Sequence, residues 1–277
     1  MSRLTIISIC DAFLVALLAL SIVTIAHADV PPYEVKQAAE KGLPDFLSAI
    51  PREDLEHYGF KSEEELRVAT LGEPYRVYTI VPKRLASYKE GTKLSALIAE
   101  TNSWYFPVIV EDEARTILTV SLLEGRWQAV DIGGLALPRQ LQMLSARLPT
   151  ILREKGISGG YSTKFVRVFQ LYANFLAVDS DKGEFLVPLL LDPDSLGVQN
   201  YVPYTPGEVI PQLTKVVQQQ MQNDKAVIDA TWGGAGGPEE ASAPNEGSNR
   251  TTIYLVGFLG IALLGLIGGL LKARKVF

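Results

Sequence analysis

The stretch WYFPVIVEDEARTILTVSLLEGRWQAVDI, residues 104–132, decides the class of the fold. It holds three runs rich in β-branched and aromatic residues, 104–110, 116–123 and 127–132, and short polar turns separate them. A fourth run of this kind, residues 75–81, comes before them in the chain. Closely spaced runs joined by tight polar turns predict an antiparallel β-meander.

Segments with a helical period lie on both sides of this meander. Apolar residues recur every three or four positions in residues 135–155 and again in residues 208–231, so each segment is predicted to form a helix. Residues 31–71 are predicted to form short helices, with one apolar face before Pro44 and a second one after it.

Two further β-rich runs, residues 164–178 and 184–191, surround a polar turn and predict a second hairpin. Because strands and helices occur in separate blocks, we expect an α+β fold in which a meander and a hairpin pack against helices. This order is similar to a cystatin-like roll, or to two related halves. The predicted body, residues 29–232, is either one unit or two small subdomains with a break near residues 156–162.

The first 28 residues have the parts of a secretory signal peptide. Arg3 supplies the positive charge, an apolar stretch follows it, and Ala26 and Ala28 are small residues at the positions that signal peptidase requires. We therefore predict cleavage after Ala28, with an uncleaved N-terminal anchor as the alternative.

The last part of the chain is predicted to cross a membrane. Residues 253–271 carry no charge, and at 1.5 Å per residue they would extend for about 28 Å, close to the hydrocarbon thickness of a bilayer. The basic residues of the tail, 272–277, indicate that the C-terminus is cytoplasmic. Residues 233–252 are rich in Gly, Pro, Glu and Ser, which is typical of a flexible linker.

Small residues on the predicted membrane helix suggest what it can pack against. Ala262, Gly265 and Gly269 share one helical face, where they would let a second helix approach closely. The expected partners are therefore the lipid bilayer and, through this face, a second copy of the chain or another membrane protein. The order of polar linker, apolar span and basic end also resembles a cleavable C-terminal sorting signal, although the LPxTG motif is missing.

Charge and cysteine content exclude several classes of function. The chain has 26 Lys and Arg and 31 Asp and Glu, and with both termini set aside residues 29–251 keep 22 basic and 30 acidic residues. An acidic body repels phosphate backbones, so no nucleic-acid partner is expected. The one cysteine, Cys10, belongs to the predicted signal peptide, so the mature protein would have neither disulfides nor thiolate chemistry.

The sequence has few groups that support catalysis. His57 is the one histidine of the predicted mature chain, and it is interpreted as a surface residue on a charged turn. Hard oxygen ligands gather in the second half of the body, where they are candidates for a calcium site. These candidate ligands are Asp179, Asp181, Glu184, Asp192 and Asp194.

Aromatic residues of the meander allow two interpretations. Trp104, Tyr105 and Trp127 are candidates for a binding groove, whereas burial in the core of the sheet is the commoner fate of such residues.

The sequence thus predicts a single-pass membrane protein with an extracytoplasmic body and no cofactor, unless calcium binds at the acidic residues. We expect a non-enzymatic interaction or accessory module of the cell envelope or of a membrane complex. The alternative is an extracytoplasmic hydrolase of glycan or peptide that uses paired carboxylates or calcium.

Overall fold

The computed structural model describes residues 29–232. The predicted signal peptide with Ala26 and Ala28, the linker, the membrane helix with Ala262, Gly265 and Gly269, and the tail all lie outside the described residues. Within residues 29–232, no helix is both long enough and apolar enough to cross a bilayer. Residues 29–226 belong to one compact unit, and of the unit that starts at Val227 the structure describes only the end of a helix.

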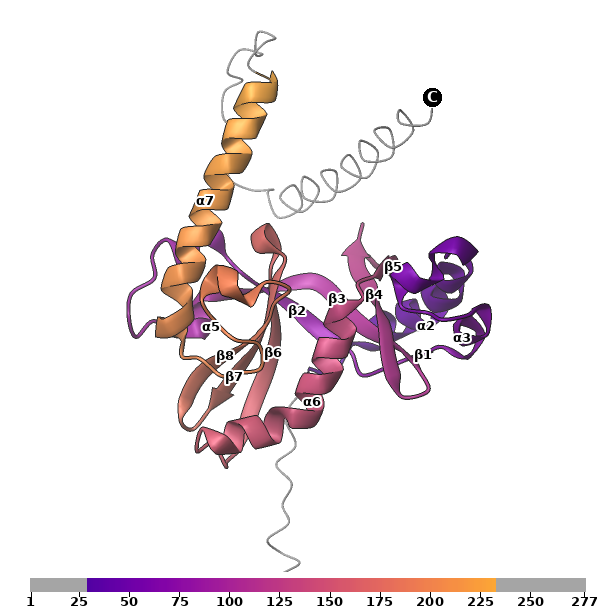
Figure 1. Cartoon of the computed structure of the whole chain (residues 1–277), viewed down its shortest axis with the longest axis horizontal. Helices are drawn as coiled ribbons and strands as arrows, with labels where there is room; N and C mark the ends of the chain where they lie inside the picture. The colour runs from indigo at the N-terminus through magenta and orange to yellow at the C-terminus, as the bar shows by residue number, and fades with distance from the viewer. Residues whose placement is uncertain (1–28, 233–277) are drawn as a thin grey trace, which may run out of the picture. The chain divides into compact units, whose positions relative to one another are not determined.

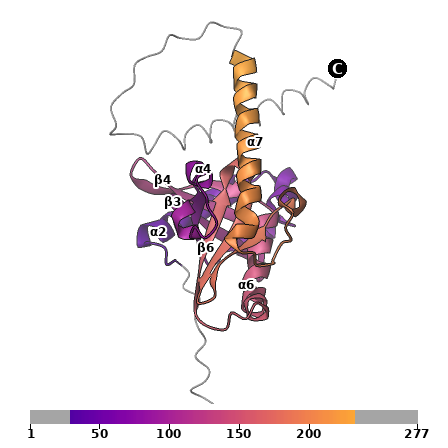
Figure 2. The same cartoon turned by 90° about the vertical axis from the view of Figure 1, so that its left-hand side faces the viewer.

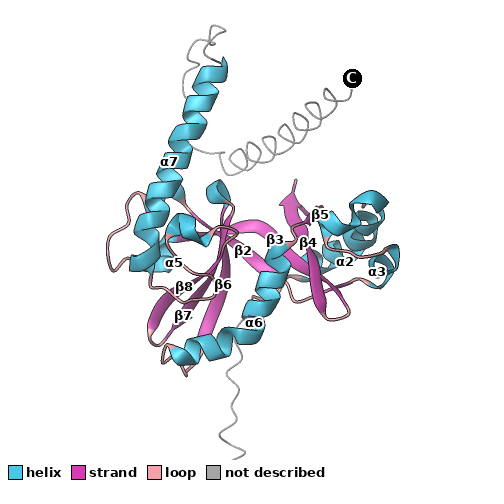
Figure 3. Cartoon of the chain, in the orientation of Figure 1, coloured by secondary structure: helices cyan, strands magenta, loops and turns pink. Residues whose placement is uncertain are grey.

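The body is built on one sheet of eight strands, drawn in magenta in Figure 3. The strand order is β5-β4-β3-β2-β6-β7-β8, and β1 pairs with β3. Every pairing of named strands is antiparallel except that of β2 with β6, so the predicted α+β class with a mostly antiparallel sheet is confirmed. The strands are β1 Thr70–Leu71, β2 Tyr75–Ile80, β3 Ile98–Val110, β4 Glu113–Leu123, β5 Arg126–Gly133, β6 Tyr161–Val168, β7 Ala173–Ser180 and β8 Gly183–Leu189.

Two helices match the sequence prediction closely. The predicted segments 135–155 and 208–231 are α6 and α7, and each has a stripe of buried Leu, Ile or Val. The α-helices are α2 Tyr33–Ser48, α3 Glu63–Val68, α4 Pro82–Leu85, α5 Leu94–Leu97, α6 Ala136–Glu154 and α7 Pro206–Trp232. Short 3₁₀ segments are η1 Arg52–Tyr58, η2 Phe169–Leu171 and η3 Pro193–Leu196.

The helices cover opposite faces of the sheet. Side chains alternate along each strand, so Tyr105 packs with α6 on one face while Trp104 packs with α2 on the other. On the same face of the sheet as α2, helix α7 packs against β6, β7 and β8 and forms a second core with them. Figure 1 shows α6 crossing in front of the strands, and Figure 2 shows α2 and α6 on opposite sides of them.

Two local predictions were wrong. A break at Pro44 was expected, but α2 continues through it, because Val35, Ala39, Leu43 and Leu47 form one buried stripe along the whole helix. Burial of this stripe stabilises the helix more than the missing hydrogen bond of Pro44 destabilises it.

Residues 164–178 were expected to form a single β run, but they contain the end of β6, the turn η2 and most of β7. Tyr172, at φ 51°, reverses the chain without any of the Gly, Pro, Asn or Asp residues that normally indicate a turn. The chain therefore forms two strands where one was predicted, and β6 becomes free to pair with β2.

Candidate binding site

The candidate aromatic residues do not share one groove. Trp104 is buried and Trp127 half-buried, and both pack into the core under α2. Tyr105 is buried on the opposite face, where its ring contacts the ring of Phe165 at a centroid distance of 5.5 Å. The strand alternation that buries them thus places Tyr105 apart from the two tryptophans.

The candidate calcium ligands lie in separate places. Asp179 and Glu184 are paired across β7 and β8, and the carboxylate of Glu184 accepts hydrogen bonds from the amides of Leu94 (2.6 Å) and Ser95 (3.4 Å). Asp181 lies in the turn between these strands.

The remaining two candidates, Asp192 and Asp194, lie at the start of η3. Among residues 29–232, no three His, Cys, Asp or Glu side chains are grouped so that they could hold a metal ion. The role that the structure gives Glu184 is to hold the start of α5.

His57 lies on η1 with an exposed side chain, and its Nδ1 is 3.4 Å from a carboxylate oxygen of Asp54, three residues earlier. This is the local pair expected for a histidine on a charged surface turn.

The face of the sheet that α6 covers changes character along its strands. The apolar residues of this face, among them Val77, Phe165 and Leu189, form a core with α6. Farther along the same strands, the residues on this face are polar, and none of them belongs to that core. These polar residues are Thr79 of β2, Ser103 of β3, Thr119 and Ser121 of β4, Asp131 of β5, Arg167 of β6 and Asn174 of β7.

Arg167 is held among aromatic rings at the edge of this polar area. Its guanidinium carbon lies 5.8 Å from the ring centre of Tyr105, 5.4 Å from that of Phe169 and 5.9 Å from that of Tyr172. Its Nη1 donates a hydrogen bond of 2.8 Å to the hydroxyl of Tyr105. Three rings and one hydrogen bond hold the guanidinium in place before any ligand arrives.

The turn η2 places two of these rings at the surface. Phe169 is 41% exposed and Tyr172 is 55% exposed, because the reversal at Tyr172 turns both side chains away from the core. We call Arg167, Phe169 and Tyr172 the arginine–aromatic site.

Several polar atoms next to this site have no hydrogen-bond partner among the described residues. They are the buried Nε of Arg167, the Oε1 of Gln170 and the Oδ1 of Asn174, which faces Arg167 across the β6–β7 pair. Buried polar atoms are nearly always paired in folded proteins, so three such atoms together indicate a place where a ligand or water completes the bonding.

Asp131 lies close enough to Arg167 and Tyr105 to act on them electrostatically. Asp131 is an exposed residue, but the partial burial of its carboxyl raises its pKa, while the amide of Ile132 and the charge of Arg167 lower it. Burial also raises the pKa of Tyr105, whereas the charge of Arg167 and its hydrogen bond lower it. The polar area therefore holds one cation, one carboxyl and a neutral phenol.

A second arginine cluster, on the opposite face, has a carboxylate partner within the chain, although the buried Nε of Arg76 has no hydrogen-bond partner among the described residues. Arg76 contacts the rings of Tyr78 and Trp104, and its Nη2 is 2.5 Å from a carboxylate oxygen of Glu100. The hydroxyl of Tyr78 donates a hydrogen bond of 2.7 Å to Asp29. Burial and this bond raise the pKa of Tyr78. A cation that already has a carboxylate partner is a structural element rather than a binding site.

Sequence reasoning missed the arginine–aromatic site for a specific reason. Without the turn at Tyr172, Arg167 and Phe169 appear as ordinary alternating residues of one strand. The signal that could have revealed them is a charged residue flanked by Val166 and Val168 in an otherwise apolar run.

No protein-family model, curated protein or solved structure matches this chain.

Proposed function

We propose that this chain is a single-pass membrane-anchored protein whose extracytoplasmic body is a non-enzymatic interaction module of the cell envelope or of a membrane complex. The predicted signal peptide, linker and apolar span support its location. The arginine–aromatic site supports binding, and we assign the contact with a partner protein to it.

The observation that carries this proposal is an arginine held between two half-exposed aromatic rings. Residues that dominate binding energy at protein interfaces are enriched in Tyr, Trp and Arg, and they work best when they are rigid and become fully desolvated. Arg167 is rigid because three rings surround it, while Phe169 and Tyr172 still offer exposed apolar surface to a partner. Truncation of such a central anchor typically costs about 2 kcal/mol or more of binding energy.

The rival function, a hydrolase with two carboxyls, is less well supported. Such an enzyme needs a second acid about 5–10 Å from the first one, across a cleft. Asp131 has a raised pKa, as a general acid would, but the charged group that acts on it is Arg167. The charge of Arg167 favours the ionised form of Asp131, which opposes a role as a general acid.

We also infer that the body consists of two related halves. In each half a helix precedes an antiparallel meander, α2 before β2–β5 and α6 before β6–β8. The first strands of the halves, β2 and β6, are parallel neighbours, and the two helices cover opposite faces. A two-fold axis that lies in the sheet between β2 and β6 would produce both features.

Site-specific photo-crosslinking in the native membrane tests the proposed interaction. A photoreactive phenylalanine analogue replaces Tyr172 in the full chain, and in a matched variant it replaces Tyr33 of α2, which is 74% exposed. We expect a discrete crosslinked protein from position 172, none of the same mass from position 33, and loss of the product when Arg167→Gln is added.

Two controls make this result decisive. Arg139→Gln, which removes an exposed arginine of α6, should leave the crosslink intact, and the melting temperature of Arg167→Gln should show that the body is still folded. Identical products from positions 172 and 33, or no product from either, would contradict an interaction surface at the arginine–aromatic site.

A further inference from the structure

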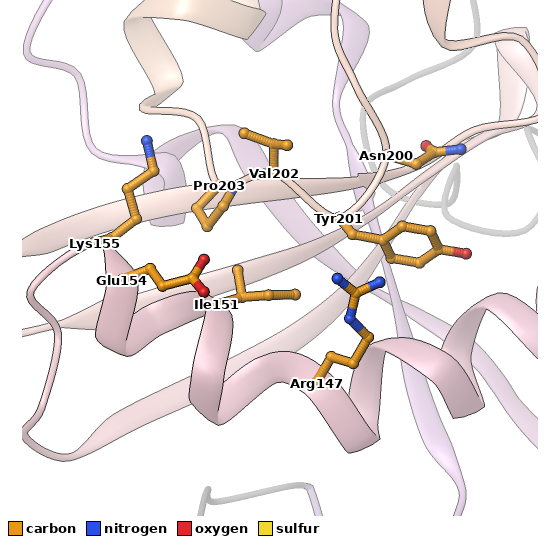
Figure 4. Close-up of a pocket in the computed structure, with 8 residues that line it drawn as sticks. All are labelled: Arg147, Ile151, Glu154, Lys155, Asn200, Tyr201, Val202 and Pro203. Atoms are coloured by element: carbon orange, nitrogen blue, oxygen red, sulfur yellow. The ribbon is translucent and has the colours of Figure 1, made fainter.

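A pocket separate from the arginine–aromatic site lies between α6 and the segment that follows β8. Its volume is about 250 Å³, and Figure 4 shows the side chains that line it. Arg147, Ile151 and Glu154 extend into it from α6, and Tyr201 and Pro203 face them from the other wall.

The segment after β8 that forms one wall of the pocket is fixed by hydrogen bonds at both of its ends. The side chain of Asn200 bonds both the amide (2.7 Å) and the carbonyl (2.8 Å) of Leu190, and Tyr204 exchanges two backbone hydrogen bonds with Leu186. Between these two anchors Tyr201 has φ 65°, a conformation that non-glycine residues rarely adopt. Strained backbone that is fixed from both sides is typical of functional sites.

Arg147 is an exposed residue of the pocket wall, and within residues 29–232 it forms no ion pair and no side-chain hydrogen bond. The neighbouring cation, Lys155, is partly balanced by Glu208, whose pKa is lowered first by the amide and hydroxyl of Thr205 and then by Lys155.

Tyr201 lines the same pocket as Arg147. Burial raises the pKa of Tyr201, and the charge of Arg147 opposes this rise. Figure 4 shows Arg147 and Tyr201 reaching the pocket from facing segments, so the guanidinium and the phenol are both available as donors to an acceptor with two oxygens.

We propose that this pocket binds the C-terminal carboxylate of a peptide that ends in an apolar residue. The carboxylate is bound by Arg147 and the hydroxyl of Tyr201. The apolar side chain packs on Ile151, Val202 and Pro203. Glu154, at the other end, accepts a hydrogen bond from a peptide amide.

The size of the pocket and the charges of its lining residues favour a peptide C-terminus over other anionic ligands. The pocket is smaller than the roughly 300–1,000 Å³ of sites that hold drug-sized ligands, so it fits one or two residues of a peptide. An inorganic phosphate would leave the apolar wall unmatched and would approach Glu154. A short fatty acid would satisfy Arg147 but has no donor for Glu154. Capture of a chain end by fixed donors is a known mode of peptide recognition.

Calorimetric titration of the detergent-solubilised full chain tests the proposal with N-acetyl-Ala-Leu and its C-terminal amide. We expect the free acid to bind and the amide to bind at least about tenfold more weakly, since hydrogen bonds to charged groups are lost. Arg147→Gln should weaken binding of the acid about ten- to a hundredfold, while Arg153→Gln, on the same helix but outside the pocket, should leave it unchanged.

Several outcomes would overturn the assignment. They are equal binding of acid and amide, wild-type affinity in Arg147→Gln, competition by inorganic phosphate, equal binding of hexanoate, or no binding of the free acid at about 10 mM, near the weak limit of measurable affinity. Arg167→Gln should keep full peptide affinity, so failure here and failure of the proposed interaction surface can be told apart.

Discussion

The buried arginine of the first meander makes the sharpest prediction about what holds the body together. Arg115 is 2% exposed, and a β-bulge between β3 and β4 inserts it as an extra residue, so that its side chain turns toward α3. Its Nη2 lies 2.9 Å from Glu65, and its Nη1 lies 2.5 Å from Glu113. The side chain of Glu65 is 16% exposed, whereas that of Glu113 is 61% exposed.

These exposures set the expected magnitudes. Breaking a buried ion pair by removing one partner lowers the free energy of unfolding by about 3–5 kcal/mol. After Glu65→Gln the arginine still has Glu113 as an ion-pair partner, so we expect a smaller loss of about 2–3 kcal/mol. Glu113→Gln removes the exposed partner and should cost less than about 1 kcal/mol. The double variant Glu65→Gln/Arg115→Met leaves no buried charge and should lie within about 1 kcal/mol of the wild type.

Urea unfolding, followed by the fluorescence of the buried Trp104, measures these free energies. The essential result is that the double variant is more stable than Glu65→Gln alone, because the lone buried charge has been removed. Simple additivity of Glu65→Gln and Arg115→Met would show that the two side chains are not coupled, and equal destabilisation by Glu65→Gln and Glu113→Gln would show that burial does not set the strength of these ion pairs.

Three further predictions concern the backbone, one carboxyl and the ends of the chain. Gly59→Ala should destabilise the body by about 2 kcal/mol or more, because φ is 87° and the new Cβ would lie 2.5 Å from a backbone oxygen. Gly125→Ala, at φ 76° with nothing within 4 Å, should cost only about 1–2 kcal/mol, and equal losses in urea unfolding would refute the steric argument. Asp131→Asn should raise the melting temperature at pH 7. The folded-state pKa of Asp131 is raised, so the wild type loses stability as pH rises from about 3.8 through that higher pKa. The increase in melting temperature caused by Asp131→Asn should vanish below pH 3.8. An increase that does not change with pH would show that the ionised carboxylate of Asp131 is not its cause. Intact mass spectrometry of the membrane protein should find a chain from Asp29 to Phe277, and a product without the apolar span would favour a cleaved sorting signal.

The parts of the fold that were predictable are those in which local pattern and burial agree. The stripe from Leu141 to Leu152 on α6 has a helical period and is buried, and the polar turns of the 104–132 segment lie where the strands reverse. These features depend on residues close together in the sequence, so periodicity was enough to find them.

Pairing between distant strands was not predictable in the same way. The parallel pair of β2 and β6 joins Val77 to Phe165, and the turn at Tyr172 brings β7 to the other edge of β6. Nothing in either strand alone specifies a parallel partner, since both are short strands in which apolar and polar residues are mixed. The arginine–aromatic site depends on this topology, because Arg167 reaches Tyr105 across β2.

Within residues 29–232 neither Arg167 nor Arg147 forms an ion pair, and both belong to a body that is acidic overall. Long-range electrostatics would therefore slow the approach of an anionic partner, since residues 29–251 carry eight more acidic than basic side chains. At about 0.1 M salt the Debye length is roughly 10 Å, so this repulsion is screened before the partner reaches contact. Close to the surface, aromatic rings contact the guanidinium of Arg167, and the hydrogen bonds of Asn200 fix the backbone wall that faces Arg147. Recognition at either site must then come from short-range hydrogen bonds and apolar contact, which reward the shape of the bound group more than its total charge.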